Sequence, residues 1–273
     1  MNNYLFVILI LWPCTLVAAT LLNMLISQAF NWSELLFCIF AGICIGYFFM
    51  TGTEPAPHAI DQFMLIFSHG LFGLFSVAGI RDFSNRMVLY QWSALFMIAA
   101  VIITALLDRL ALTIGKSMNT AGFLLSLLIF PLKAPFTLIT SGVSLIIFFL
   151  FSGIWVAIFR NNTRLGFLGG TPYIEWNFGG NYSFATTLGF TVNTWKGNLS
   201  TLLGHELYHT RQYMIFRDWF IPFWLLGGIW GLITSMLSSN PFDIRYFFIA
   251  HPSKNIGNPL EQAAYHSGGT KPF

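Results

Sequence analysis

Long apolar runs, separated by short polar segments, make up most of the first 160 residues of the chain. A helix of about 17–25 apolar residues is long enough to cross a lipid bilayer. Four runs reach that length, and we expect each to be a membrane helix: Tyr4–Gln28, Glu34–Thr51, Phe63–Ile80 and Met87–Leu107. Gly42 and Gly46, four residues apart in the second run, favour close packing of that helix against a neighbour.

The segment between residues 120 and 160 allows two interpretations. Ala121–Phe130 is too short to cross alone and is followed by Pro131 and Pro135, whereas Thr137–Phe159 is long enough to cross. We expect a short re-entrant or interfacial piece followed by one membrane helix, with a helical hairpin as the alternative. The choice decides which side of the membrane the rest of the chain faces. Basic residues flank Met87–Leu107 on both sides, so the positive-inside rule does not decide it.

Beyond residue 160 the pattern changes. Residues 161–198 are rich in Gly, Asn and Thr and contain no long apolar run. Tyr173–Phe178 and Tyr182–Leu188 have the composition of β-strands, and Gly179-Gly180-Asn181 between them predicts a hairpin turn. Thr186–Trp195 is a candidate for a further strand.

The composition agrees with a membrane protein. Charged residues make up 8% of the chain, against about 25% in soluble proteins, and the mean hydropathy is +0.69. We expect a mainly α, multi-pass integral membrane protein of the bacterial inner (cell) membrane. Four or five N-terminal transmembrane helices would occupy residues 1–160, and a small α+β domain would occupy residues 161–273. The net charge of +3 is too small and too dispersed to indicate a nucleic-acid partner, so the expected partners are the lipid bilayer and a substrate.

One motif points to chemistry: His205-Glu206-Leu-Tyr-His209, an H-E-x-x-H sequence. Asn198 is a suitable N-cap for a helix that continues to about Phe216, so the motif falls within a helix. Residues i and i+4 of a helix share one face, so both imidazoles can bind one metal ion, and Glu206 can contact a water on that metal. Chance gives this pattern in roughly two or three of a thousand chains of this composition, so the motif alone is reason to propose a metal site.

Two histidines do not complete a catalytic zinc site, which usually takes three protein ligands and a water. The acidic residues downstream of the motif are Asp218, Asp243 and Glu261. Asp218 is too close along the same helix to fold back onto the metal. Glu261 follows Pro259, which suits the first turn of a helix. We therefore expect Glu261 early on a short helix that packs against the motif helix, with Asp243 as the alternative ligand.

The motif and its downstream partner together resemble a group of zinc metallopeptidases of the gluzincin type. The residues that carry the resemblance lie within about residues 165–265: His205-Glu-x-x-His209-x-x-Gln212, Phe220-Ile-Pro222 and Asn258-Pro-x-Glu261-x-x-Ala264-Tyr265. The resemblance implies a zincin-like domain in which His205, His209 and Glu261 bind Zn²⁺. It implies that Glu206 is the general base, and that a strand flanks the cleft, here Thr186–Trp195.

We accordingly expect a membrane-anchored zinc-dependent hydrolase, first of all a metallopeptidase, that uses Glu206 to activate a zinc-bound water. A zinc hydrolase that acts on a lipid or on a lipid-linked amide or ester is one alternative. A catalytically silent membrane protein with a zinc-stabilised domain that binds a partner is another. Tyr265 and His266, beside the expected ligand Glu261, are candidate donors to an oxyanion.

Trp219–Leu237 constrains this hypothesis, because its nineteen residues are almost all apolar and could span a bilayer. A complete crossing would put His205 and Glu261 on opposite sides of the membrane. The segment could instead pack within the domain or lie in the membrane interface, or it could turn back near Gly227-Gly228. The third solution is a site inside the membrane, with Asp243 as the acidic ligand.

Overall fold

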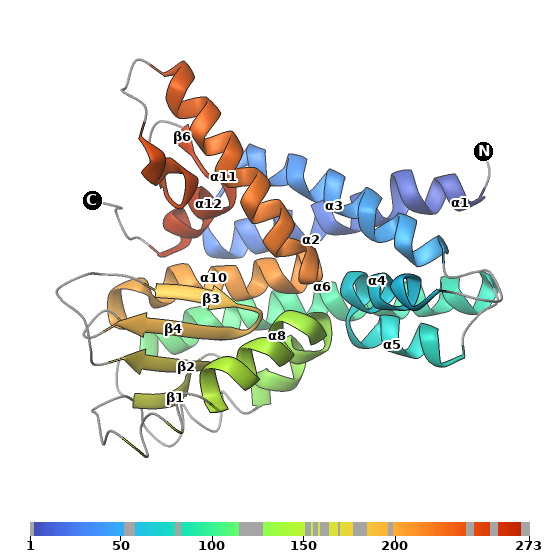
Figure 1. Cartoon of the computed structure of the whole chain (residues 1–273), viewed down its shortest axis with the longest axis horizontal. Coiled ribbons are helices and arrows are strands. Elements are labelled where there is room, and N and C mark those ends of the chain that lie inside the picture. Colours follow the sequence, from blue (N-terminus) through green and yellow to red (C-terminus); the bar gives the residue numbers. More distant parts are fainter. Residues whose placement is uncertain are drawn as a thin grey trace.

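The computed structural model describes residues 3–51, 58–79, 83–114, 128–150, 154, 158, 164–168, 170–176, 185–195, 199–238, 243–251 and 256–268. Most of these residues are helical, and the strands fall between residues 164 and 257. Figure 1 shows the four-stranded sheet at the end of the helical bundle that lies away from the N-terminus.

Four helical stretches are long and apolar enough to cross a membrane: Asn3–Ser27, Trp32–Met50, Ser84–Leu110 and Gly204–Leu237. Their presence indicates a membrane protein, as the composition predicts. The first three confirm the helices that the hydrophobic pattern predicts in these parts of the chain. Within the described residues, three such stretches precede residue 160, where the sequence predicts four or five.

The first stretch is one continuous helix built from α1 (Asn3–Phe6), the π-helical η1 (Val7–Leu11) and α2 (Trp12–Ser27). It packs against α3 (Trp32–Thr51), and the third stretch lies within α6 (Phe83–Ile114). A Cβ at Gly46 would lie 2.9 Å from the Cα of Ile8, and one at Gly42 would overlap the backbone of Pro13. The two glycines therefore permit the close approach that their spacing predicts.

The prediction of one membrane helix over Phe63–Ile80 is wrong. The chain forms α4 (Ala59–His69) and α5 (Leu71–Ala78), which are too short to cross a bilayer. Gly70 between them has φ +57°, and a Cβ there would overlap the carbonyl oxygen of Pro135. The break therefore has a tertiary cause, because the backbone of a later segment occupies the space beside Gly70.

Residues 128–150 continue the helical part of the chain. Helix through Lys133 leads into η2 (Ala134–Phe136), α8 (Leu138–Ser144) and the π-helical η3 (Leu145–Leu150). Most of the predicted re-entrant piece Ala121–Phe130 lies outside the described residues, as does the end of the predicted helix Thr137–Phe159. The part of that helix up to Leu150 is helical as predicted.

The four-stranded sheet has the order β1-β2-β4-β3. Its strands are β1 (Arg164–Leu168), β2 (Thr171–Trp176), β3 (Ala185–Leu188) and β4 (Thr191–Trp195). β2 and β4 are parallel, and the outer pairs are antiparallel. The predicted hairpin between Tyr173–Phe178 and Tyr182–Leu188 is wrong, because β4 lies between β2 and β3.

The expected strand Thr186–Trp195 is in fact two strands. A two-residue turn at Gly189 and Phe190 joins β3 to β4, and Gly189 has φ +61°. A glycine accepts this left-handed conformation without the steric cost that a side chain would add, so the chain reverses here. Because β4 also pairs with β2, β3 and not β4 lies at this edge of the described sheet, with β1 at the other.

The helix α10 (Leu199–Phe216) confirms the helix predicted up to Phe216. It contacts the sheet as well as α2, α3 and α6. After the single 3-10 turn η4 (Arg217–Trp219), α11 (Phe220–Leu237) leaves α10 at a steep angle (Figure 1). The chain then returns through η5 (Ile244–Phe247), β5 (Ala250–His251) and β6 (Ile256–Gly257) to α12 (Pro259–Gly268), which packs against α10.

One hydrophobic core crosses the expected domain boundary at residue 160. Buried side chains of α2 and α3, among them Trp12 and Phe49, belong to the same cluster as Phe216 of α10, Phe223 of α11 and Leu260 of α12. Within the described residues, α10 is therefore packed as part of the membrane-helix bundle. The division into regions 1–160 and 161–273 stays a prediction.

Candidate metal centre

The structure brings His205, His209 and Glu261 together. The two histidines lie one turn apart on α10, and Glu261 lies in the first turn of α12. The Nε2 atoms of the histidines are 3.0 Å apart, and Glu261 Oε2 is 3.1 Å from His205 Nε2 and 3.4 Å from His209 Nε2. All three side chains are buried. Their ligand atoms lie within 4.8 Å of one another, so this group could hold a metal ion.

The Asn-Pro-x-Glu sequence gives Glu261 its place. Asn258 Oδ1 accepts a hydrogen bond from the backbone N–H of Leu260 (3.1 Å), which starts α12. The Nδ2 of Asn258 donates to the carbonyl oxygen of Trp224 in α11 (3.0 Å). In turn the indole Nε1 of Trp224 donates to Glu261 Oε1 (2.6 Å). Asn258 and Trp224 therefore attach the start of α12 to α11 and leave Oε2 of Glu261 beside the histidines.

The other two acidic candidates lie elsewhere. Asp243 forms an ion pair with Arg245, with 2.7 Å between Oδ2 and the guanidinium Nη2. Asp218 is buried and accepts hydrogen bonds from the backbone N–H groups of Ile139 and Thr140. Of the three acids downstream of the motif, Glu261 alone belongs to the cluster of candidate metal ligands among the described residues.

The apolar segment after the motif does not separate His205 from Glu261. α11 is one unbroken helix, so the alternative in which the segment turns back near Gly227-Gly228 is wrong, and the change of direction occurs at η4 instead. A Cβ at Gly231 would overlap the carbonyl oxygen of Tyr246, and one at Gly228 would lie 2.8 Å from that of Phe247. The glycines allow the returning chain to run against α11, which carries α12 back to α10.

Glu206 lies beside the three candidate ligands. Its Oε1 is 3.9 Å from His205 Nε2, and its Oε2 accepts a hydrogen bond of 2.6 Å from the hydroxyl of Thr187 in β3. The edge strand therefore holds one carboxylate oxygen of Glu206 while the other faces the histidine. No sequence pattern around Thr187 predicts this contact, because the contact depends on how the sheet packs against α10.

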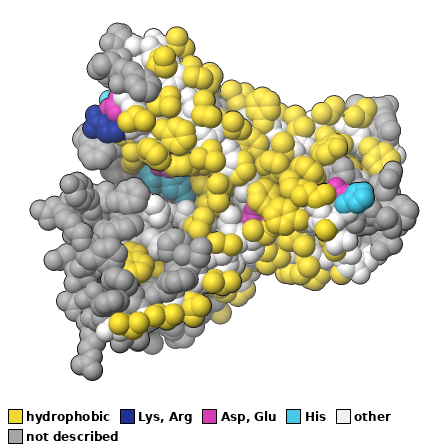
Figure 2. All heavy atoms as spheres, viewed as in Figure 1, with side chains coloured by type: hydrophobic (Ala, Val, Ile, Leu, Met, Phe, Trp, Pro, Cys, Tyr) yellow, Lys and Arg dark blue, Asp and Glu magenta, His cyan; other side chains and the backbone are white. Residues whose placement is uncertain are grey.

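A cavity of about 460 Å³ opens at the cluster. One wall is β3, and another consists of Phe220, Ile221 and Trp224 of α11 together with Phe248 and Tyr265. Among the described residues that line it, the carboxylates and histidines are His205, Glu206, His209 and Glu261. Figure 2 shows histidine atoms in a hollow of the surface, next to a broad area of hydrophobic side chains. The cavity therefore has mainly apolar walls around the two histidines and two glutamates.

The surroundings of Glu261 and Tyr265 set their protonation. Burial raises the pKa of Glu261, but the neighbouring His209 and His205 oppose this by charge and hydrogen bonds, and the pKa falls well below its usual value. Burial raises the pKa of Tyr265, and the carboxylates of Glu261 and Glu206 raise it further. The Tyr265 hydroxyl, whose ring packs 4.4 Å from that of His205, therefore keeps its proton and stays a donor. His266 is exposed and does not line the cavity.

Comparisons with models of known protein families, with curated proteins and with solved structures find no match to this chain.

Proposed function

We propose that the protein is a membrane-anchored zinc-dependent hydrolase, and first of all a metallopeptidase of the gluzincin type. His205, His209 and Glu261 would hold the Zn²⁺ ion, and Glu206 would be the general base. The observation that carries the proposal is the meeting of Glu261 with His205 and with His209, which is 52 residues earlier in the chain. The proposed location is the bacterial inner membrane, with the four apolar helices as support for a membrane location in general.

The donor set fits zinc. Imidazole nitrogen and carboxylate oxygen are common zinc ligands, and three protein ligands are typical of a catalytic site that keeps one position open. When bound, such an ion supplies Lewis-acid chemistry, because it polarises a carbonyl and makes water acidic enough to lose a proton near neutral pH. The cavity at the cluster would offer space for a substrate next to the ion.

Three side chains around the cluster would transfer the proton, orient the general base and stabilise the developing negative charge. Glu206 accepts the proton of the attacking water at the carboxylate oxygen that faces His205, and later donates it to the leaving group. Thr187 keeps that carboxylate oriented through its hydrogen bond to Oε2. Tyr265, with its proton retained, can donate to the negative charge that develops on the carbonyl oxygen.

A peptide is the favoured substrate because an edge strand lines the cavity. Among the described strands β3 pairs with β4 on one side only, and β3 residues form one wall. An open strand edge can add an extended peptide by main-chain hydrogen bonds. Those bonds would hold a peptide across the centre and would give a lipid no comparable hold.

The apolar surface of α11 favours the alternative, a lipid or a lipid-linked amide or ester. Ile221 and Trp224 line the cavity, and the outer side of the same helix is exposed and apolar. The exposed residues of that side are Leu225, Leu226, Ile229, Trp230, Ile233, Met236 and Leu237. Hydrolysis assays in detergent micelles should compare an extended hydrophobic peptide with an N-acyl amide lipid. Cleavage of the lipid alone would favour the alternative.

Metal content tests the proposal directly. The full-length chain should purify with about one zinc ion, and His205→Ala and Glu261→Ala should each lose it. Asp243→Ala is the matched control, because Asp243 pairs with Arg245 away from the cluster, and it should keep the metal. A wild-type chain that binds no zinc would exclude both hydrolase hypotheses. Retained zinc and full biological activity in Glu206→Gln would favour the silent binding protein.

A further inference from the structure

A buried carboxylate in a membrane helix lies close to the candidate metal centre. Glu34 belongs to the first turn of α3, and its side chain is fully buried. Within the described residues no basic side chain lies within ion-pair distance of it. Its two donors are neutral: the Tyr208 hydroxyl (3.0 Å to Oε2) and the side-chain amide of Gln212 (2.8 Å from Nε2 to Oε1). A carboxyl group in such surroundings is costly to bury, which suggests a functional role.

Gln212 connects Glu34 to His209. Its Nε2 donates both to Glu34 and to the carbonyl oxygen of Leu260 (3.1 Å). Its Oε1 lies 2.7 Å from His209 Nδ1. The reversed amide would place its oxygen against the carbonyl of Leu260 and the carboxylate of Glu34, which both accept hydrogen bonds. The orientation of the amide is therefore fixed by Glu34 and Leu260.

The fixed amide also fixes the tautomer of His209. An amide oxygen only accepts, so Nδ1 of His209 carries the hydrogen and donates it to Gln212. In the neutral ring Nε2 then carries a lone pair on the side of His205 and Glu261, as a metal ligand must. His205 has no comparable support, because its Nδ1 has no hydrogen-bond partner among the described residues.

We propose that Glu34 is a positioning residue for the metal centre, which acts through Gln212 to hold His209 as a ligand. This inference rests on the proposed metal site. It assigns a role to a membrane helix far from the motif in sequence, since Glu34 and Gln212 are 178 positions apart. Because Gln212 also binds Leu260 of α12, the site is complete only when α3, α10 and α12 are packed together.

The test is the zinc affinity of the full-length protein in detergent, measured by competition with a chelator. Glu34→Ala and Gln212→Met should each bind Zn²⁺ about 10- to 100-fold more weakly, the usual effect of losing a group that orients a ligand. Glu34→Gln should keep most of the affinity, because its amide oxygen can accept the same hydrogen bond from Gln212. Thr20→Val is the matched control: Thr20 is buried in α2 and its hydroxyl bonds Cys38 instead of Glu34, Gln212 or His209, so its variant should bind zinc normally.

Two further measurements separate positioning from general damage to the fold. If Glu34 acts through Gln212, Glu34→Ala combined with Gln212→Met should bind zinc no more weakly than Gln212→Met alone. The absorption spectrum of bound Co²⁺ should change in both single variants and stay unchanged in Thr20→Val.

Wild-type zinc affinity in Gln212→Met would overturn the inference, even if Glu34→Ala failed to fold. Additive losses in the double variant would also overturn it. A wild-type protein that binds no Zn²⁺ would instead reject the proposed function.

Discussion

Trp224 donates a hydrogen bond to Glu261, with 2.6 Å between the indole Nε1 and Oε1. The other carboxylate oxygen of Glu261 faces His205 and His209. A residue of the apolar helix α11 thus orients the acidic member of the cluster. The helix α11, which by its length could separate Glu261 from the histidines, instead donates the hydrogen bond that orients Glu261.

Trp224→Phe should therefore weaken zinc binding while leaving the cavity wall aromatic. A hydrogen bond to a charged group contributes about 1.5–3 kcal/mol, so the dissociation constant for Zn²⁺ should rise roughly tenfold or more. Chelator competition measures this change. Trp219→Phe is the matched control, because Trp219 donates to Ser68 and not to the cluster, and it should bind zinc like the wild type.

Glu206→Gln should keep the zinc and lose hydrolysis. The amide cannot accept the proton of the attacking water, and general-base catalysis typically contributes about 10²- to 10⁴-fold to the rate. Metal analysis and turnover of a cleaved substrate, measured on one preparation, check both parts. Loss of metal together with activity would indicate a structural role for Glu206 instead.

Thr187→Val should slow hydrolysis with zinc unchanged, because it removes the hydrogen bond that orients Glu206. We expect turnover to fall roughly tenfold or more, since a hydrogen bond to a charged group contributes about 1.5–3 kcal/mol. Thr187→Ser keeps the hydroxyl and should restore most of the rate. Equal losses in both variants would mean that the packing of β3, and not the hydroxyl, matters.

The sequence predicts the local part of the candidate site and not the distant part. His205, Glu206 and His209 follow from helical spacing, and Glu261 follows from the Asn-Pro-x-Glu start of α12, since both signals depend on a few neighbouring residues. Trp224 carries no such signal, because its contact with Glu261 joins positions 37 apart. That contact depends on the angle between α11 and α12, which only the packed fold determines.

The same limit applies to the fold. Hydrophobic length predicts α2, α3 and α6, because a membrane helix is mainly a matter of apolar residues in sequence. The break at Gly70 depends on the backbone of Pro135, and the position of β4 between β2 and β3 depends on strand pairing. Neither leaves a periodic pattern in the residues themselves.

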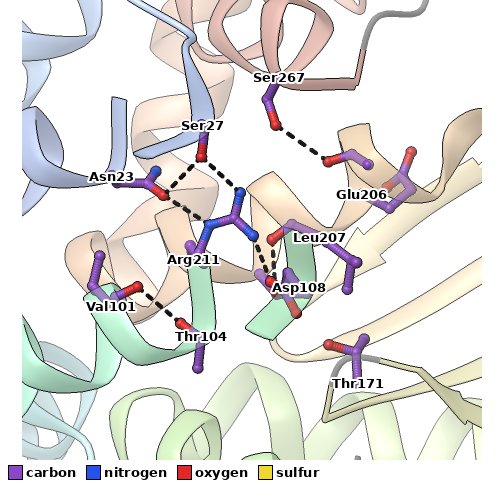
Figure 3. Close-up of polar contacts among 12 residues, drawn as sticks. Asn23, Ser27, Val101, Thr104, Asp108, Thr171, Glu206, Leu207, Arg211 and Ser267 are labelled. Atoms are coloured by element: carbon purple, nitrogen blue, oxygen red, sulfur yellow. Dashed lines mark hydrogen bonds and ion pairs between the residues drawn. The ribbon is translucent and has the colours of Figure 1, made fainter. Parts of the chain in front are cut away.

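A buried cluster of charged side chains includes Arg211 of the motif helix α10. Figure 3 shows the guanidinium of Arg211 between Asn23 and Ser27 on one side and Asp108 on the other. Lys133, also buried, lies 3.4 Å from the same carboxylate. Asp108 is thus the acidic partner of two buried cations.

Asp108→Asn should destabilise the protein strongly, because it leaves Arg211 and Lys133 without their counter-charge. Breaking a buried ion pair typically costs about 3–5 kcal/mol, which should appear as a large fall in the unfolding midpoint in detergent. Asp243→Asn is the control, because Asp243 pairs with the exposed Arg245, and it should not change the midpoint measurably. Similar midpoints for the two variants would show that the buried cluster adds little stability.

Lys133 should make stability depend on pH. Burial lowers the pKa of its ammonium group from 10.5 to about 8; Asp108 opposes the fall and Arg211 adds to it. Thr171 and Thr210 complete its contacts. Between pH 8 and 10.5 the unfolded chain binds the extra proton, so the contribution of Lys133 to stability is full above about pH 10.5 and is lost as the pH falls to about 8.

Lys133→Met removes this titration and keeps the volume. Its stability relative to the wild type should therefore be highest near pH 7 and should decline above pH 8, by up to about 1.4 kcal/mol per pH unit. Unfolding midpoints of both proteins between pH 6 and 10 give the difference, in which the other titrating groups cancel. A difference that stays constant over this range would contradict the lowered pKa.

Gly231→Ala should disturb the candidate site from a distance. A Cβ at this position of α11 would overlap the carbonyl oxygen of Tyr246 and lie 2.7–2.8 Å from the backbone of Gly257 and Asn258. Overpacking of this kind costs about 1–3 kcal/mol, and relief requires the returning chain to move away from α11. Because Asn258 starts α12, the shift should displace Glu261 and weaken zinc binding as well as lower the unfolding midpoint.

Gly142→Ala is the control, since a Cβ at Gly142 of α8 meets nothing within 4 Å. This variant should keep the wild-type zinc affinity, and its stability should be unchanged or slightly higher. A Gly231→Ala variant that loses stability but binds zinc normally would show that α12 keeps its place without close contact to α11.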